Sequence, residues 1–230
     1  MLSTDMFAIV LVFVVFQSGL YLLMRAACTD ASSKTVRKTR AWLLSLHISF
    51  LFGCLLAPLY LFWTVRAVQQ GTGAFDTFWR AETYVERGLC LYFVAFCLVD
   101  LLIGMLEYRE YIAWDTGILN TSVFIFIVLY VFLKHNLGVF FLIYSPFEVP
   151  TFILALGTVF PSWRSDLWFG VTFFAFRIVY HIFMFAYCLV VATSVPAWAV
   201  WASGTLPLLF HFVWFFKWGV GQLKRARKEA

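Results

Sequence analysis

Seven long apolar runs follow one another along the chain, each bounded by charged or polar residues. A membrane-spanning helix needs about 20 predominantly apolar residues, and each run is close to that length. The first run lacks a basic leading segment and a cleavage site, so we expect it to be retained. The pattern predicts seven transmembrane helices at residues 6–24, 41–65, 88–106, 116–133, 137–160 and 167–193, with a seventh run from after Ser194-Val195-Pro196 to Phe216.

The amino-acid composition also indicates a membrane protein. Hydrophobic residues make up 63% of the 230 residues, charged residues make up 13%, and the mean hydropathy is +0.88. A soluble domain carries about 25% charged residues, so a soluble globular protein, a disordered chain and a secreted disulfide scaffold are excluded. Seven spans use roughly 140 apolar positions, which leaves little sequence for another domain. The polar Lys134-His135-Asn136 segment predicts a tight turn between the fourth and fifth runs.

The placement of basic residues predicts the orientation. With seven spans, the first, third and fifth loops and the C-terminal tail share one side. That side holds 12 of the 17 Lys and Arg residues, the opposite side holds four, and one lies within a span. Positive charge collects on the cytosolic side, so the C-terminus should face the cytosol or the mitochondrial matrix and the N-terminus the other side. The 12 residues are Arg25, Lys34, Arg37, Lys38, Arg40, Arg109, Arg164, Lys217, Lys224, Arg225, Arg227 and Lys228.

Ionisable groups inside membrane helices are costly, so each one is a functional candidate. Glu148 lies 11 residues past Leu137, and Arg177 lies 10 residues past Leu167. At 1.5 Å per residue these positions are about 16 and 15 Å deep in a core of roughly 30 Å. We therefore predict that Glu148 and Arg177 pair near the midplane of the membrane.

The remaining polar positions extend this set. Asp100 and Asn120 both fall toward the basic side and are expected to meet there. Arg177 and His181 are four residues apart and share a helical face, while His211 lies in the seventh run. Three interpretations stay open: polar contacts that hold the helices together, a site for a lipid headgroup or acyl chain, and catalysis.

Two prolines and five cysteines complete the candidates. Pro146 and Pro150 flank Glu148, so we expect a distorted helix with carbonyl groups freed toward the interior. The cysteine count is odd and no pair has metal-ligand spacing, which favours apolar packing roles and predicts no metal site and no cofactor. The sequence has no phosphate-binding glycine loop, nucleophile elbow or internal repeat. It also lacks aromatic-basic interleaving outside the apolar runs, so we expect no nucleic-acid partner.

Four segments carry a family resemblance. Residues 96–101, with Val99-Asp100-Leu101, look like an Asp-Leu signature that ends an early helix, and residues 148–152 look like a Glu-x-(Ser/Thr/Pro)-rich element. Residues 173–178 resemble an aromatic-Arg-Ile helix, and residues 212–219 resemble a last helix that ends Trp-Phe-x-Lys. Their order and spacing resemble the TLC-domain family, which includes ceramide synthases and the translocation-associated membrane protein. The resemblance covers roughly residues 40–225.

The resemblance implies an all-α polytopic membrane protein with seven transmembrane helices. Residues 1–40 would form the N-terminal helix and a basic loop, residues 41–218 a six-helix barrel with a cavity open to lipid, and residues 219–230 a basic cytosolic tail. The resemblance also implies that the protein is located in the membrane of the endoplasmic reticulum. The mitochondrial inner membrane is the alternative, because the charge pattern fits a matrix-facing tail equally well.

One departure from the family pattern bears on activity. Catalytic members carry adjacent histidines at the place where this chain has Asn120-Thr121. An amide and a hydroxyl cannot serve as an imidazole base with a pKa of about 6.5. The resemblance therefore implies that acyl transfer is lost and that there is no catalytic residue. His181 would replace the missing base only if it faced the cavity.

We expect a non-catalytic, TLC-like membrane protein that binds or shelters lipid in its barrel, with a phospholipid or sphingolipid as the candidate ligand. One alternative is a structural accessory subunit of a larger complex, such as a respiratory or ATP synthase assembly of the mitochondrial inner membrane, with other subunits as partners. The other is an acyl-lipid enzyme that uses Glu148, Arg177 and His181. The predicted lipid-binding or intramembrane polar network comprises Asp100, Asn120, Glu148, Arg177, His181 and His211.

Overall fold

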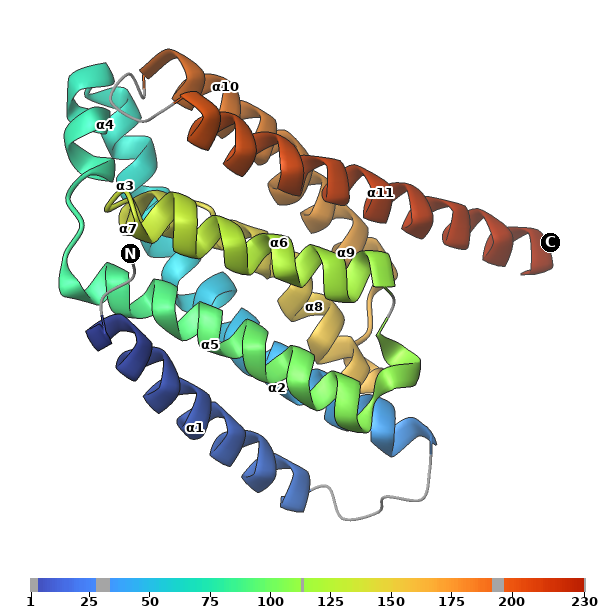
Figure 1. The fold of residues 1–230 in the computed structure, drawn as a ribbon. Coiled ribbons are helices and arrows are strands. Elements are labelled where there is room, and N and C mark those ends of the chain that lie inside the picture. Colours follow the sequence, from blue (N-terminus) through green and yellow to red (C-terminus); the bar gives the residue numbers. More distant parts are fainter. Residues whose placement is uncertain (1–3, 28–33, 113, 192–196, 230) are drawn as a thin grey trace.

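The computed structural model describes residues 4–27, 34–112, 114–191 and 197–229, and every regular element within them is helical (Figure 1). The α-helices are α1 (Thr4–Ala27), α2 (Lys34–Ser49), α3 (Ala57–Gln69), α4 (Thr72–Trp79), α5 (Tyr84–Glu107), α6 (Asn120–Phe126), α7 (Gly138–Ile143), α8 (Glu148–Val159), α9 (Asp166–Thr172), α10 (His181–Val191) and α11 (Ala197–Glu229). The π-helical segments are η1 (Phe50–Leu56), η3 (Trp114–Leu119), η4 (Ile127–Leu133) and η7 (Phe173–Tyr180), and the 3₁₀ turns are η2 (Arg109–Tyr111), η5 (Ser145–Phe147) and η6 (Pro161–Trp163).

The helical segments follow the apolar runs. The described parts of the seven runs lie in α1, α2–η1–α3, α5, η3–α6–η4, α7–η5–α8, α9–η7–α10 and α11. The Ser194-Val195-Pro196 segment and Cys28 lie outside the described residues. Five helical stretches are long and apolar enough to cross a membrane, which indicates an integral membrane protein: Asp5–Ala26, Thr39–Gln69, Tyr84–Glu107, Gly138–Val159 and Asp166–Val191. The stretch Gly117–Leu133 is a shorter apolar helix.

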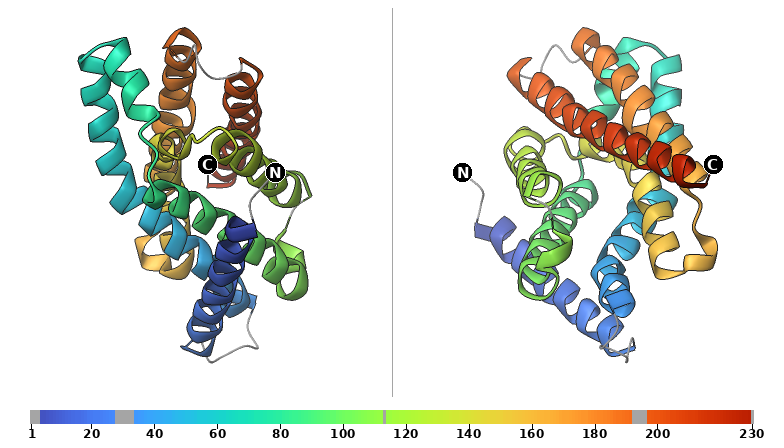
Figure 2. Two further views of the ribbon diagram at one scale, coloured as in Figure 1. Left: turned by 60° about the vertical axis from the view of Figure 1, so that its left-hand side comes forward. Right: turned by 90° about the vertical axis from the view of Figure 1, so that its right-hand side faces the viewer.

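Six of these segments form a ring, in which α9 continues directly into η7 and the two count as one segment. Going around it, α2 packs against α8, α8 against α9, η7 against α11, α11 against α6, α6 against α5, and α5 against α2. Helix α1 lies outside the ring alongside α5, as Figures 1 and 2 show. Side chains from all six segments therefore face one common interior.

The ring has two different ends. At one end, which we call the α4 end, Phe75 and Trp79 of α4 are almost completely buried and contact Tyr187 and Phe140 through their rings. The interior at this end is filled by an aromatic and aliphatic core that includes Phe52, Phe132 and Phe141. The opposite end holds the start of α2, the end of α8 and the start of α9. We call it the basic end, after Arg40, Arg164 and Lys217.

Local signals in the sequence account for several helix boundaries. The Thr83 hydroxyl caps α5 by accepting from the Val85 amide, and the Glu86 carboxylate accepts from the Thr83 amide at 2.8 Å, a reciprocal pair that satisfies two N-terminal amides. The Ser165 hydroxyl caps α9 by accepting a hydrogen bond from the Trp168 amide at 3.2 Å. The predicted tight turn at residues 134–136 is confirmed, with Asn136 in the left-handed region at φ 55°.

The predicted distortion around Glu148 is also confirmed. The fifth run is divided into α7, the 3₁₀ turn η5 and α8. Pro146 lies in η5 and Pro150 in the first turn of α8, where a missing N–H group is tolerated. The Tyr180 hydroxyl donates to the Ile143 carbonyl at 2.9 Å, across the gap between α7 and η7. The break in the helix is therefore bridged by side chains of a neighbouring segment.

Helix α11 runs without interruption from Ala197 to Glu229 and carries Pro207 in its interior. Figure 1 shows it as one long helix along one side of the ring. The predicted boundary between the barrel and the basic tail, at residues 218–219, falls inside this helix. The basic residues at the end of α11 therefore continue a helix that also lines the interior of the ring.

Candidate functional site

A cavity of about 560 Å³ occupies the half of the ring toward the basic end. Its walls come from the six segments of the ring, which are α2, α5, α6, α8, α9–η7 and α11, together with Tyr21 of α1. The aromatic core closes the α4 end. The mouth of the cavity is at the basic end, where the side chains of Arg164 and Arg225 are 43% and 56% exposed.

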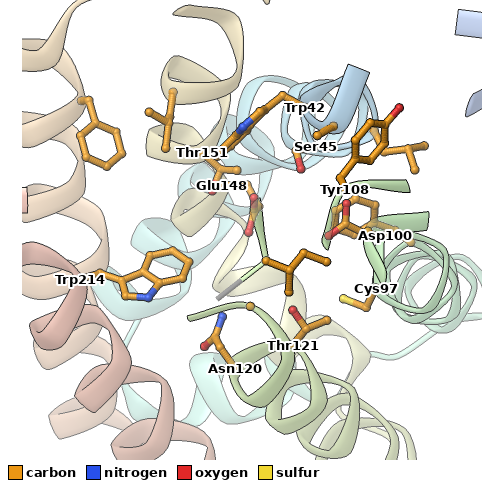
Figure 3. Close-up of a pocket in the computed structure, with 18 of the residues that line it drawn as sticks. Trp42, Ser45, Cys97, Asp100, Tyr108, Asn120, Thr121, Glu148, Thr151 and Trp214 are labelled. Atoms are coloured by element: carbon orange, nitrogen blue, oxygen red, sulfur yellow. The ribbon is translucent and has the colours of Figure 1, made fainter. Parts of the chain in front are cut away.

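Polar side chains line the interior wall of this cavity. Asp100 projects from α5, Asn120 and Thr121 from α6, and Glu148 and Thr151 from α8 (Figure 3). Asp100 and Asn120, which the sequence predicts to meet, both line this cavity. Aromatic rings occupy much of the remaining surface, including those of Trp42, Phe93, Phe96, Phe124 and Trp214. The cavity therefore combines a polar wall with apolar sides.

Arg177 is a buried cation of the site, with 7% of its surface exposed. Its Nε donates to the Phe147 carbonyl at 2.8 Å, and its Nη2 donates to the Thr151 hydroxyl at 2.6 Å. Nη2 lies 3.7 Å from Glu148 Oε1, so the predicted Glu148–Arg177 pair is confirmed. The guanidinium carbon lies 5.4 Å from the ring centroid of Trp214, within the range of a cation–π contact.

Close backbone packing holds Glu148 in this position. Gly53 of η1 faces the start of α8, and a Cβ atom added to it would lie 2.8 Å from the Glu148 carbonyl carbon and 2.9 Å from the Val149 amide nitrogen. Only glycine permits this approach. The π-helical segments η1 and η7 thus contribute Gly53 and Arg177 to the same place, and π-helical turns are frequent at functional sites.

Some buried polar atoms on the wall lack a hydrogen-bond partner among the described protein residues. They include Asn120 Oδ1, Trp214 Nε1 and Trp218 Nε1, and all three residues line the cavity. A buried polar group without a partner costs about 1–3 kcal/mol. These atoms therefore mark places where a bound molecule with its own donors and acceptors would gain hydrogen bonds.

Helix α1 completes the wall next to α5. The Tyr21 hydroxyl donates to Glu107 Oε2 at 2.9 Å and accepts from the Tyr108 hydroxyl through a short hydrogen bond. Burial raises the pKa of Tyr108 above its ordinary value. Arg25 also pairs with Glu107. This polar cluster fixes the end of α1 against the ring.

His181 and His211, the two histidines predicted as site residues, do not line the larger cavity. His181 is completely buried and lines neither this cavity nor a smaller one of about 50 Å³ next to it. His211 lines the smaller cavity, which shares Glu148 and Arg177 with the larger one. The two Nδ1 atoms are 3.3 Å apart, and His211 Nδ1 is 3.0 Å from the Arg177 carbonyl. Asp100, Asn120, Glu148 and Arg177 are brought together, and His181 lies behind them.

Sequence reasoning missed several wall residues. Trp42, Trp214 and Trp218 lie near the ends of apolar runs, a position typical of the membrane interface, yet they line the cavity. For Cys97 the sequence favours a packing role. The cysteines described are free thiols at Cys54, Cys90, Cys97 and Cys188, and Cys97 faces the cavity (Figure 3). Among the described residues, no group of three or more His, Cys, Asp or Glu side chains is placed to hold a metal ion.

A comparison with protein-family models finds no match, and neither the curated proteins nor the solved structures contain a significant match to this chain.

Proposed function

We propose that the protein is a non-catalytic, TLC-like membrane protein with seven spans, whose cavity binds part of a membrane lipid. The observation that carries this proposal is the cavity of about 560 Å³ with a polar wall, apolar sides and a basic mouth. Its volume lies within the range of about 300–1,000 Å³ found for sites of small ligands. An amphiphile matches such a lining, because its polar group meets the polar wall and its chain meets the aromatic rings.

The surroundings of the cavity support a membrane lipid as the ligand. The outer surface of the helices is apolar, as Phe7 and Leu23 of α1 illustrate with 72% exposure each. Large exposed apolar surface is unusual on a soluble monomer and is expected where helices face lipid. The residues at the mouth lie at the ends of the apolar runs, close to Ala41, Leu167 and Phe216. A lipid in the surrounding bilayer would therefore present its headgroup at the level of the mouth.

The positions of Asn120, Thr121 and His181 support a binding role over catalysis. Asn120 and Thr121 line the cavity where catalytic TLC-domain proteins carry histidines. His181 shares a helical face with Arg177, and it packs against Phe147 and His211 behind the wall. Among the described residues no histidine lines the larger cavity, and an amide and a hydroxyl cannot act as an imidazole base.

The distribution of basic residues and the family resemblance support the proposed orientation and the proposed organelle. The excess of basic residues on one side favours a cytosolic C-terminus, and the family resemblance favours the endoplasmic reticulum. The cavity mouth would then open toward the cytosolic leaflet. The mitochondrial inner membrane, with the mouth toward the matrix, is the alternative.

The proposal is tested by native mass spectrometry of the protein purified in a mild detergent. We expect a mass that exceeds that of the chain by one lipid, because a ligand held inside the ring is protected from exchange. Recovery in a fixed ratio with other membrane subunits, without a bound lipid, would instead support the accessory-subunit alternative. Recovery of a lipid-free, unaccompanied chain from native membranes would overturn both.

A further inference from the structure

The mouth of the cavity gathers positive charge from separate elements. Arg40 belongs to α2, Arg164 precedes α9, and Lys217 and Arg225 belong to α11, and all four line the cavity. Asp166 is the carboxylate among them. Its two oxygens accept from different residues, Oδ1 from Arg164 Nε at 3.1 Å and Oδ2 from Arg225 Nη1. Asp166 therefore holds two guanidinium groups side by side at the mouth.

The other polar groups at this level are mostly donors. Each guanidinium carries five N–H groups, and the bonds to Asp166 use one of them on each residue. Trp218 adds a buried indole N–H without a partner among the described residues, and Gln222 adds an amide. A ligand that fits this set must offer several acceptor oxygens and negative charge.

The depth of these groups indicates where the acceptor oxygens lie. Arg40 directly precedes the second apolar run, Arg164 lies between the fifth and sixth, and Lys217 directly follows the seventh. They are therefore placed at headgroup level, whereas Glu148 and Arg177 are near the midplane. A phosphate group carries negative charge and several strong acceptor oxygens, and it accepts paired hydrogen bonds from arginine. A neutral glycerol or sugar headgroup carries no negative charge to attract the guanidinium groups of Arg164 and Arg225.

We propose that the mouth formed by Arg40, Arg164, Lys217 and Arg225 recognises the phosphate group of a lipid headgroup whose chain enters the cavity. This inference rests on the proposed function and names the class of ligand. Asp166 is a positioning residue, because its carboxylate orients Arg164 and Arg225.

The test compares two lipids that differ only in the phosphate. The purified chain is loaded with equal amounts of phosphatidic acid and diacylglycerol that carry the same acyl chains, and the bound fraction of each is measured by native mass spectrometry. We expect phosphatidic acid to be retained at least about tenfold over diacylglycerol, as charged hydrogen bonds of this kind provide. In the double variant Lys217→Gln/Arg225→Gln this preference should fall about tenfold.

A matched control separates the mouth from general surface charge. Lys224→Gln/Arg227→Gln removes the same charge from the same helix at positions outside the cavity lining, and it should keep the preference within about twofold. Arg164→Gln serves as a second mouth variant if the first one unfolds at a lower temperature than the unmodified chain.

Each other outcome decides against a stated part of the inference. Equal retention of the two lipids, or an equal loss in the control variant, would overturn phosphate recognition at the mouth and leave the proposed lipid-binding function standing. Retention of neither lipid would overturn the proposed function itself. Displacement of phosphatidic acid by inorganic phosphate at similar concentration would overturn the lipid headgroup as the source of the phosphate.

Discussion

At the residue scale, Arg177 joins η5, α8 and α11 through its guanidinium group. Its guanidinium bonds to the Phe147 carbonyl and the Thr151 hydroxyl, and it lies near the Glu148 carboxylate. The carbonyl is at the start of α8, where the helix is broken, and the arginine comes from η7. One buried side chain thus satisfies polar groups of a broken helix and balances a carboxylate in an apolar environment.

Replacement of Arg177 by Met should lower the free energy of unfolding by about 3 kcal/mol, because Glu148 would remain as an unpaired buried charge. The pair variant Arg177→Met/Glu148→Gln should recover part of this loss. Thermal unfolding in detergent measures both. The matched control is Arg66→Met, where the side chain is exposed and the change should stay within about 0.5 kcal/mol. Equal stability of Arg177→Met and Arg66→Met would contradict the structural role of the pair.

The residue scale also shows what sequence could and could not predict. The depth of Glu148 and Arg177 follows from counting residues along two helices, so their pairing could be predicted from the sequence. The direction of Trp214 and Trp218 was not, because helices that are apolar on all sides carry no clear periodic signal for the face that points inward. Position near a span end suggested the membrane interface, whereas both rings line the cavity.

At the element scale, the break between α7 and α8 and the π-helical segment η1 act together. The break places Glu148 at the first turn of α8, and Gly53 of η1 lets the two backbones come into contact there. Pro146 and Pro150 predicted this break in the helix. The π-helical segments were not predictable, because a single inserted residue leaves the apolar pattern unchanged. Helix α4 was also missed, since its eight residues include Gly73, Asp76 and two threonines and form no long apolar run.

Gly53→Ala should destabilise the fold by about 1–3 kcal/mol, the usual cost of an extra group in a packed interior. The added methyl group would collide with backbone atoms of Glu148 and Val149, which cannot move aside as a flexible side chain can. Gly19→Ala is the matched control, since nothing lies within 4 Å of its added Cβ and alanine favours the helix. A melting temperature of Gly53→Ala at or above that of the unmodified chain would contradict the close approach.

At the scale of the whole molecule, the ring has a closed end and an open end. Aromatic packing fills the α4 end, and the cavity occupies the basic end. The apolar runs predicted the helical segments well because each long run has few solutions other than a helix in a membrane. The order of helices around the ring depends on packing between segments far apart in the chain, and no local pattern encodes it.

The orientation belongs to this scale as well. The charge distribution predicts that an epitope at the C-terminus is digested when protease is added to sealed microsomes, while an epitope at the N-terminus is protected. Detergent should expose both epitopes. Protection of the C-terminal epitope, with digestion of the N-terminal one, would show that the basic end faces the lumen.

The central claim is that the cavity holds a lipid, and a variant that fills the cavity tests it most directly. Thr121 lines the cavity, whereas the neighbouring Ser122 is exposed on the outside of the same helix. Native mass spectrometry should therefore show loss of the bound lipid in Thr121→Phe and retention in Ser122→Phe, with both variants folded. Equal lipid occupancy in the two variants would show that the lipid lies elsewhere and would contradict the account.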